Sequence, residues 1–198
     1  WSPTPRIEFG LARPAHMRVS DAGGITDTQL TLTSSLGELT LTGELGAAGP
    51  LQAELVGSKL QLDILSELFP DTITGLSGTA ATTVRLSGTA EAPVVQVDFG
   101  ITDLFLEGSA RYLDVQGGAL WAANRLEPDV SVSVADVPFL EIDGSLPLAG
   151  SLTSAGLDPQ GDTDLSIALR PGPFGRIAQA APSVDAASLP QGDIGAVV

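Results

Sequence analysis

The sequence predicts an all-β protein with one or two short helices. One observation is that apolar and polar residues alternate with a period of two in run after run. Such alternation places one row of side chains on each face of a half-buried strand. The other observation is that many of the 23 Gly and 14 Pro lie between the runs. Glycine permits positive φ and proline fixes φ, so both favour turns.

The alternating runs follow one another at the spacing typical of all-β domains. In chain order they cover residues 28–33, 38–42, 51–55, 59–63, 95–99, 130–134 and 164–169. In each run, Leu, Val, Ile or Ala occupy one face and mostly Thr, Ser, Gln, Asp or Glu the other. Short helices are expected at 64–69 and 174–181, because Pro70 and Pro182 must end them.

Two architectures satisfy this alternation. A β-sandwich would bury the apolar row against a second sheet, whereas a long curled sheet would leave it lining a trough. Aromatic residues are 5% of the chain, so the large side chains that fill a sandwich core are few. Burying a methylene contributes about 0.8 kcal/mol, so a half-buried acyl chain of about sixteen carbons would gain roughly 6 kcal/mol. Periodicity alone leaves both architectures open.

Several phrases of the sequence resemble the TamB and AsmA-like family. Residues 86–99 read LSGTAEAPVVQVDF, and residues 62–80 read LDILSELFPDTITGLSGTA: a strand, a short Leu-rich helix, Pro, then a glycine phrase. A second copy begins at Leu165 and departs from the pattern at 171–175. The similarity covers most of residues 26–198. It implies an elongated curled β-sheet groove, or β-taco, with an aliphatic interior.

The resemblance also implies a function. The family is anchored in the inner membrane, spans the periplasm and partners an outer-membrane barrel of the TamA type. It is linked to outer-membrane protein assembly, protein secretion and phospholipid transport, without catalytic residues, cofactor or metal. The cargo would be lipid acyl chains or unfolded outer-membrane β-strands. The groove lining would be carried here by Leu30, Leu32, Leu39, Leu41, Leu60, Leu62, Val95, Val97, Phe99, Val130, Val132, Val134, Leu165, Ile167 and Leu169.

We therefore expect a lead-in segment at 1–25, a repetitive β-groove at 26–170 and the start of a further, truncated repeat at 171–198. Both ends are expected to be cuts through a longer, periplasmic protein whose anchor lies outside this window. Within the window, no run of 18 apolar residues and no signal peptide is present. The alternative is a closed acidic β-sandwich that serves as a structural or adhesion module.

Charge and cysteine content exclude several functions. The chain carries 9 Lys and Arg against 24 Asp and Glu, a net charge of −15. Such a surface repels phosphate backbones and anionic headgroups, so nucleic acid is not an expected partner. There is no cysteine, which excludes disulfides, thiolate metal sites and cysteine nucleophiles.

Isolated polar residues give only weak indications of a catalytic or metal-binding site. His16 and Lys59 are the sole histidine and lysine, and we expect both to be solvated, Lys59 on the polar face of a strand. Residues 158–164 resemble a calcium loop, but Leu169 stands where an EF-hand needs Glu. An acidic turn is therefore expected there.

Two further pairs of side chains give equally weak indications of a site. Glu141 and Asp143 could mimic a glycosidase pair, yet chance pairs are expected among so many carboxylates. Trp121 and Tyr112 could stack on sugars but lie beside Gly117-Gly118, which favours packing on a turn or at a groove end.

Overall fold

The described part of the chain forms one antiparallel β-sheet with a single short helix. The computed structural model describes residues 10–21, 24–46, 50–68, 75–105, 112–152 and 154–170. Its elements are β1 (Gly10–Leu11), β2 (His16–Val19), β3 (Ile25–Ser34), β4 (Gly37–Leu45), β5 (Leu51–Gln61), α1 (Asp63–Leu68), β6 (Ser77–Gly88), β7 (Pro93–Phe105), β8 (Leu113–Ala122), β9 (Arg125–Val134), β10 (Val137–Ala149), β11 (Gly156–Leu157) and β12 (Asp164–Leu169). The all-β prediction is confirmed.

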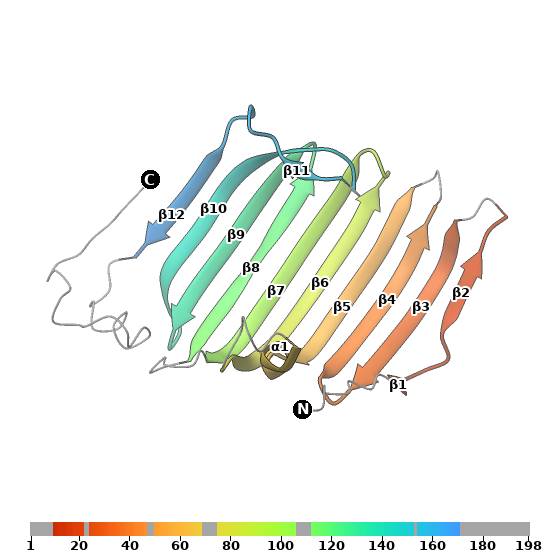
Figure 1. Ribbon diagram of the computed structural model, residues 1–198, viewed down its shortest axis with the longest axis horizontal. Coiled ribbons are helices and arrows are strands. Elements are labelled where there is room, and N and C mark those ends of the chain that lie inside the picture. The colour runs from red at the N-terminus through yellow and green to blue at the C-terminus, as the bar shows by residue number, and fades with distance from the viewer. Residues whose placement is uncertain are drawn as a thin grey trace, which may run out of the picture.

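The strands follow one another in space in the order of the sequence (Figure 1). β3 to β10 form a meander in which each strand pairs with the next. β1 and β2 both pair with β3 at one edge, and β11 and β12 both pair with β10 at the other. Within the described residues the two edges do not pair with each other, so the sheet is open. The closed-sandwich alternative needs a second sheet that faces this one. The described residues form one sheet and contain no such second sheet.

Tight turns connect several of the hairpins. The β8–β9 turn places Ala123 and Asn124 at φ 48° and 61°, and the β9–β10 turn places Ala135 and Asp136 at φ 50° and 62°. Two consecutive residues with positive φ make a type I′ turn, whose twist matches that of the flanking strands. These turns hold β8, β9 and β10 in register without a glycine at either centre.

Four bulges adjust the alternation of the strands, in β3, β5, β7 and β10. In β3, β5 and β7 the extra residues Asp27, Lys59 and Asp103 lie at φ 54°, 53° and 54°. A bulge places two residues of one strand opposite one residue of its partner. The extra residue shifts the alternation by one position, so that the residues after it project from the opposite face to the one that strict alternation would give. Lys59 therefore belongs to a bulge rather than to the polar row of a regular strand, and its side chain is exposed.

The helix lies at one end of the sheet, below the ends of β5 and β7 in Figure 1. It covers Asp63–Leu68, close to the expected 64–69. β5 ends at Gln61, so the predicted alternation through Leu62 and Asp63 is wrong. Leu62 donates its N–H to the Gly78 carbonyl at 3.0 Å, which fixes the start of α1 against β6. The helix expected at 174–181 lies outside the described residues.

Candidate functional site

One face of the sheet is mainly apolar from β3 to β12. Directly paired residues of neighbouring strands project from the same face, so the register defines the members of each row. We call the following set the apolar face: Leu30, Leu32, Leu39, Leu41, Leu55, Leu60, Val84, Leu86, Val95, Val97, Phe99, Ile101, Val115, Trp121, Leu126, Val130, Val132, Leu140, Ile142, Leu146, Leu165, Ile167 and Leu169.

The predicted lining residues fall on this face, with one exception. Leu62 lies in the turn between β5 and α1, outside the strands. Val134 continues the β9 row of Val130 and Val132 beyond the end of the β8 pairing. The strands thus place on one face residues as distant in sequence as Leu30 and Leu169, which lie at its opposite edges.

The predicted lining contains thirteen members of the apolar face and omits ten. The omitted members include Leu55, Val84, Leu86, Ile101, Val115, Trp121, Leu126, Leu140, Ile142 and Leu146. The alternation of Leu140, Ile142 and Leu146 is visible in residues 140–150 and could have located the β10 row. Trp121 lies in β8 between Val95 and Leu126, so it belongs to the face rather than to a turn.

The side chains of the apolar face are mostly half-buried. Among the described hydrophobic residues only Leu51 and Val134 are buried, at 7% and 5% exposure, and no described side chain is fully buried. The side chains of Leu60 and Leu39 lean over Gly57: a Cβ placed on Gly57 would lie 2.9 Å from Leu60 Cδ1 and 3.3 Å from Leu39 Cδ2. The face is therefore laterally packed and still presents apolar area.

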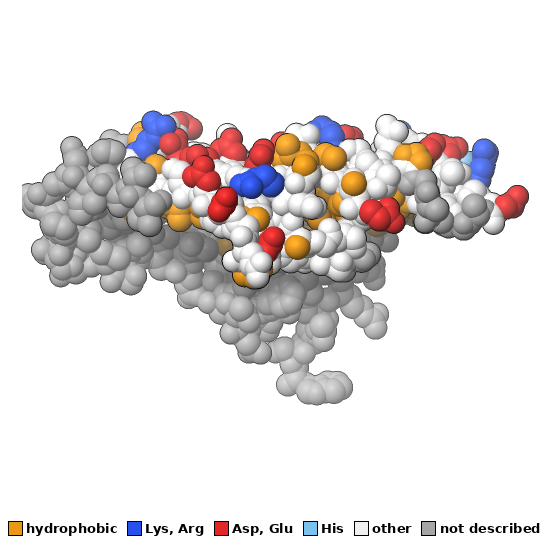
Figure 2. Space-filling view, turned by 90° about the horizontal axis from the view of Figure 1, so that it is seen from above, with side chains coloured by type: hydrophobic (Ala, Val, Ile, Leu, Met, Phe, Trp, Pro, Cys, Tyr) orange, Lys and Arg blue, Asp and Glu red, His pale blue; other side chains and the backbone are white. Residues whose placement is uncertain are grey.

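The opposite face is polar and carries the charges. Its central row is Thr31, Thr40, Val56, Thr83, Asp98, Gly118, Asp129, Asp143 and Ser166. Figure 2, which looks along the sheet, shows many of the acidic and basic side chains along the upper margin and others on the side nearest the viewer. The two faces thus differ sharply in chemistry although they share every strand.

Arg85 organises the middle of the polar face. Its Nε lies 2.8 Å from Glu54 Oε2 and its Nη1 lies 3.1 Å from Asp98 Oδ2. Gln96 also donates to Asp98, at 3.1 Å. All three charged side chains are about half exposed, so each pair contributes little to stability.

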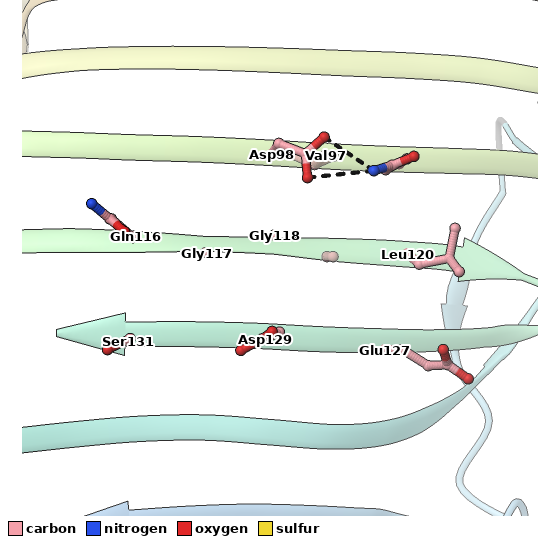
Figure 3. A pocket seen from close by; sticks show the side chains of 11 residues that line it. Val97, Asp98, Gln116, Gly117, Gly118, Leu120, Glu127, Asp129 and Ser131 are labelled. Carbon is pink, nitrogen blue, oxygen red and sulfur yellow. Dashed lines mark hydrogen bonds between the residues drawn. The ribbon is translucent and has the colours of Figure 1, made fainter. Parts of the chain in front are cut away.

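A shallow hollow of about 590 Å³ lies on the polar face over β7, β8 and β9. Figure 3 shows Asp98 and Asp129 on either side of the Gly117-Gly118 step, with Glu127 and Leu120 farther along. Gly118 is directly opposite both aspartates in the register, and its missing side chain accounts for the hollow. The described residues contain no group of three or more His, Asp or Glu side chains able to hold a metal ion.

The remaining candidate residues have local roles. Asp158 accepts a hydrogen bond from the Gln160 N–H at 3.0 Å, so its carboxylate closes its own turn. Glu141 Oε1 lies 2.7 Å from Arg170 Nη2, which makes it half of an ion pair. His16 is exposed on β2, with Nε2 3.1 Å from Asp27 Oδ2.

Tyr112 lies at the start of β8, away from the sheet centre. It is exposed, and its ring centroid is 5.5 Å from that of Phe105 at the end of β7. This contact places Tyr112 on the turn side of β7, as the packing interpretation of the sequence proposed.

Comparisons with known proteins give no relative. No known protein family, no curated protein and no solved structure matches this chain. In the part of the chain that the structure describes, no helix has the length and hydropathy needed to cross a membrane.

Proposed function

We propose that this chain is part of a non-enzymatic conduit or chaperone that holds apolar cargo on the apolar face. The observation that carries the proposal is the mainly apolar surface that runs from β3 to β12 on an open sheet, with Gly57, Thr82 and Gly117 between its larger side chains. At about 4.8 Å between strands, this surface is roughly 38 Å wide. Contiguous apolar surface of that extent is typical of a binding site.

The finer architecture belongs to the same proposal. We infer that the sheet curls about its apolar face to form the groove, or β-taco, of the TamB and AsmA-like proteins that its phrases resemble. The bulges in β3, β5, β7 and β10 support this, because each bulge bends its strand and increases local twist. The resemblance supports a periplasmic setting, an outer-membrane barrel as partner, and roles in outer-membrane assembly, secretion and phospholipid transport.

Two kinds of cargo fit the sheet. Acyl chains need only apolar area, which the face supplies. Unfolded outer-membrane β-strands need free backbone amides, which a sheet edge supplies. The face extends over many strands and the edges are short, so acyl chains are the cargo that uses most of the surface.

Adjacent residues of β9 provide a matched test. Val132 projects from the apolar face and Ser131 from the polar face, so Val132→Arg and Ser131→Arg place the same charge on opposite sides. We expect Val132→Arg to weaken uptake of a lipophilic fluorescent probe about tenfold or more, which corresponds to about 1.4 kcal/mol. Ser131→Arg should bind as the unaltered chain does.

Circular dichroism distinguishes a lost site from a lost fold. The proposal requires Val132→Arg to retain its β-sheet spectrum while losing the probe. If both variants bind the probe equally, the apolar face is not the site. If Val132→Arg unfolds, the test is repeated with Ile167→Arg. Ile167 lies in β12 and is 42% exposed, so its replacement disturbs fewer packing contacts.

A further inference from the structure

The outer edge of β12 presents a regular set of backbone groups. The Arg170 N–H donates to the Phe139 carbonyl at 2.9 Å. In an antiparallel pair, every second residue bonds to the neighbouring strand and the residues between point the other way. The N–H and C=O groups of Leu165, Ile167 and Leu169 therefore point away from β10. Among the described strands, none pairs with β12 on the side away from β10, and Figure 1 shows it as the last arrow of the sheet on this side.

The sequence of this edge is complementary to itself. Residues 164–170 read Asp-Leu-Ser-Ile-Ala-Leu-Arg, with opposite charges at the ends, small residues at 166 and 168, and apolar residues at the remaining positions. A half-turn about an axis midway between Ile167 and Ile167 of a second strand brings Asp164 opposite Arg170 and Leu165 opposite Leu169. The outward-pointing residues then face one another, as a ladder of hydrogen bonds requires.

The side chains are disposed for this pairing. Ile167 and Leu169 are each 42% exposed and belong to the apolar face. Arg170 is held by Glu141 of β10, with Nη2 2.7 Å from Oε1, and its side chain is still 56% exposed. Its guanidinium therefore stands at the edge with donors left for a second carboxylate.

We propose that β12 pairs antiparallel with β12 of a second copy of this chain, about a two-fold axis perpendicular to the sheet and midway between the two Ile167 residues. An interface of this kind is isologous, the commonest arrangement of protein dimers. The Asp164–Arg170 pair occurs twice across it. Since the axis is perpendicular to the sheet, the apolar faces of both copies lie on the same side and join into one surface.

Single cysteines test the register directly because the chain contains no cysteine. Directly opposed residues in such a ladder have Cα atoms about 5.5 Å apart, within disulfide range. We expect Ile167→Cys to form a disulfide dimer on mild oxidation at least ten times faster than Leu169→Cys. The two positions share the same 42% exposure. A mixture of Leu165→Cys and Leu169→Cys should form the heterodimer. Equal rates for Ile167→Cys and Leu169→Cys, or no dimer from either, overturn the proposal.

Charge reversal provides an independent measurement. Asp164→Arg places Arg opposite Arg170 and should raise the dimer dissociation constant in sedimentation equilibrium about tenfold. Asp162→Arg changes the net charge equally but lies outside β12, and should leave the constant within twofold. An equal effect of both substitutions would mean that overall charge, not this edge, governs association. Neither measurement uses cargo, so each can fail or succeed separately from the proposed function.

Discussion

Turn residues with positive φ are positions where a substitution can stabilise the chain. Ala135 has φ 50° in the β9–β10 turn, a region that costs an L-residue with a Cβ roughly 1–2 kcal/mol. Glycine adopts this conformation without that cost. The type I′ geometry keeps Ala there because the flanking strands require two consecutive positive φ values.

We therefore expect Ala135→Gly to stabilise the chain by about 0.5–1 kcal/mol, after the larger entropy loss of glycine is subtracted. Ala122→Gly is the control, because Ala122 lies in β8 and has no positive φ to relieve. This control should destabilise by about 0.5–1 kcal/mol. Urea denaturation midpoints measure both. A lower midpoint for Ala135→Gly would show that the turn gains nothing from glycine.

The ion pairs of Arg85 are expected to matter little for folding. Arg85 bridges Glu54 and Asp98, but the three side chains are about half exposed. We predict that Arg85→Gln costs less than about 1 kcal/mol at low salt and less still at high salt, because solvent and ions screen such pairs. Thermal unfolding at two ionic strengths tests this. A salt-independent loss of several kcal/mol would indicate a packing role for Arg85 instead.

At the scale of the strand, bulges decide which face each side chain reaches. β5 carries Leu51 and Leu55 at odd positions and Leu60 at an even one, yet all three project from the same face. The extra residue at Lys59 makes this possible, since residues 58 and 59 together oppose one residue of β6.

Deletion of Lys59 should therefore be tolerated. Removing the extra residue leaves Gly57 and Leu60 on the apolar face in a regular strand, so we expect a change of no more than about 1 kcal/mol. Deletion of Gln116 is the contrast, because the β8–β9 register carries no shift. That deletion turns part of β8 over and should abolish the cooperative transition. Circular dichroism melts of the two deletions measure the difference, and equal damage would contradict it.

Elements could be predicted from sequence where local alternation was strict. The runs around Leu30, Leu41, Val97 and Val132 lie in strands, and α1 starts one residue before the expected range. The other members of the apolar face could not be predicted in this way, because their place depends on which strands pair. Trp121 joins the apolar face because β8 pairs with β7, and nothing in its immediate neighbours indicates this. The change of parity between Leu55 and Leu60 was the visible signal of the bulge.

For the whole molecule, the consequence of an open sheet is that the described strands would cover a ligand on the apolar face from one side only. The apolar face spans β3 to β12 without an end wall among the described strands, and its side chains are half-buried. A fully enclosed methylene gains about 0.8 kcal/mol, so a methylene resting on this face should gain about half of that. Binding should therefore depend on ligand length in a way that separates an open face from a closed pocket.

We predict that single-chain amphiphiles, compared below their micelle concentrations, bind more tightly by about twofold per added methylene. This factor corresponds to about 0.4 kcal/mol. The trend should continue from ten to sixteen carbons, because the roughly 38 Å width of the face sets no limit in that range. An enclosing pocket would instead give about fourfold per methylene and then a sharp cut-off. Isothermal titration of the series distinguishes the two, and affinities that do not change with chain length would exclude the apolar face as a site for acyl chains.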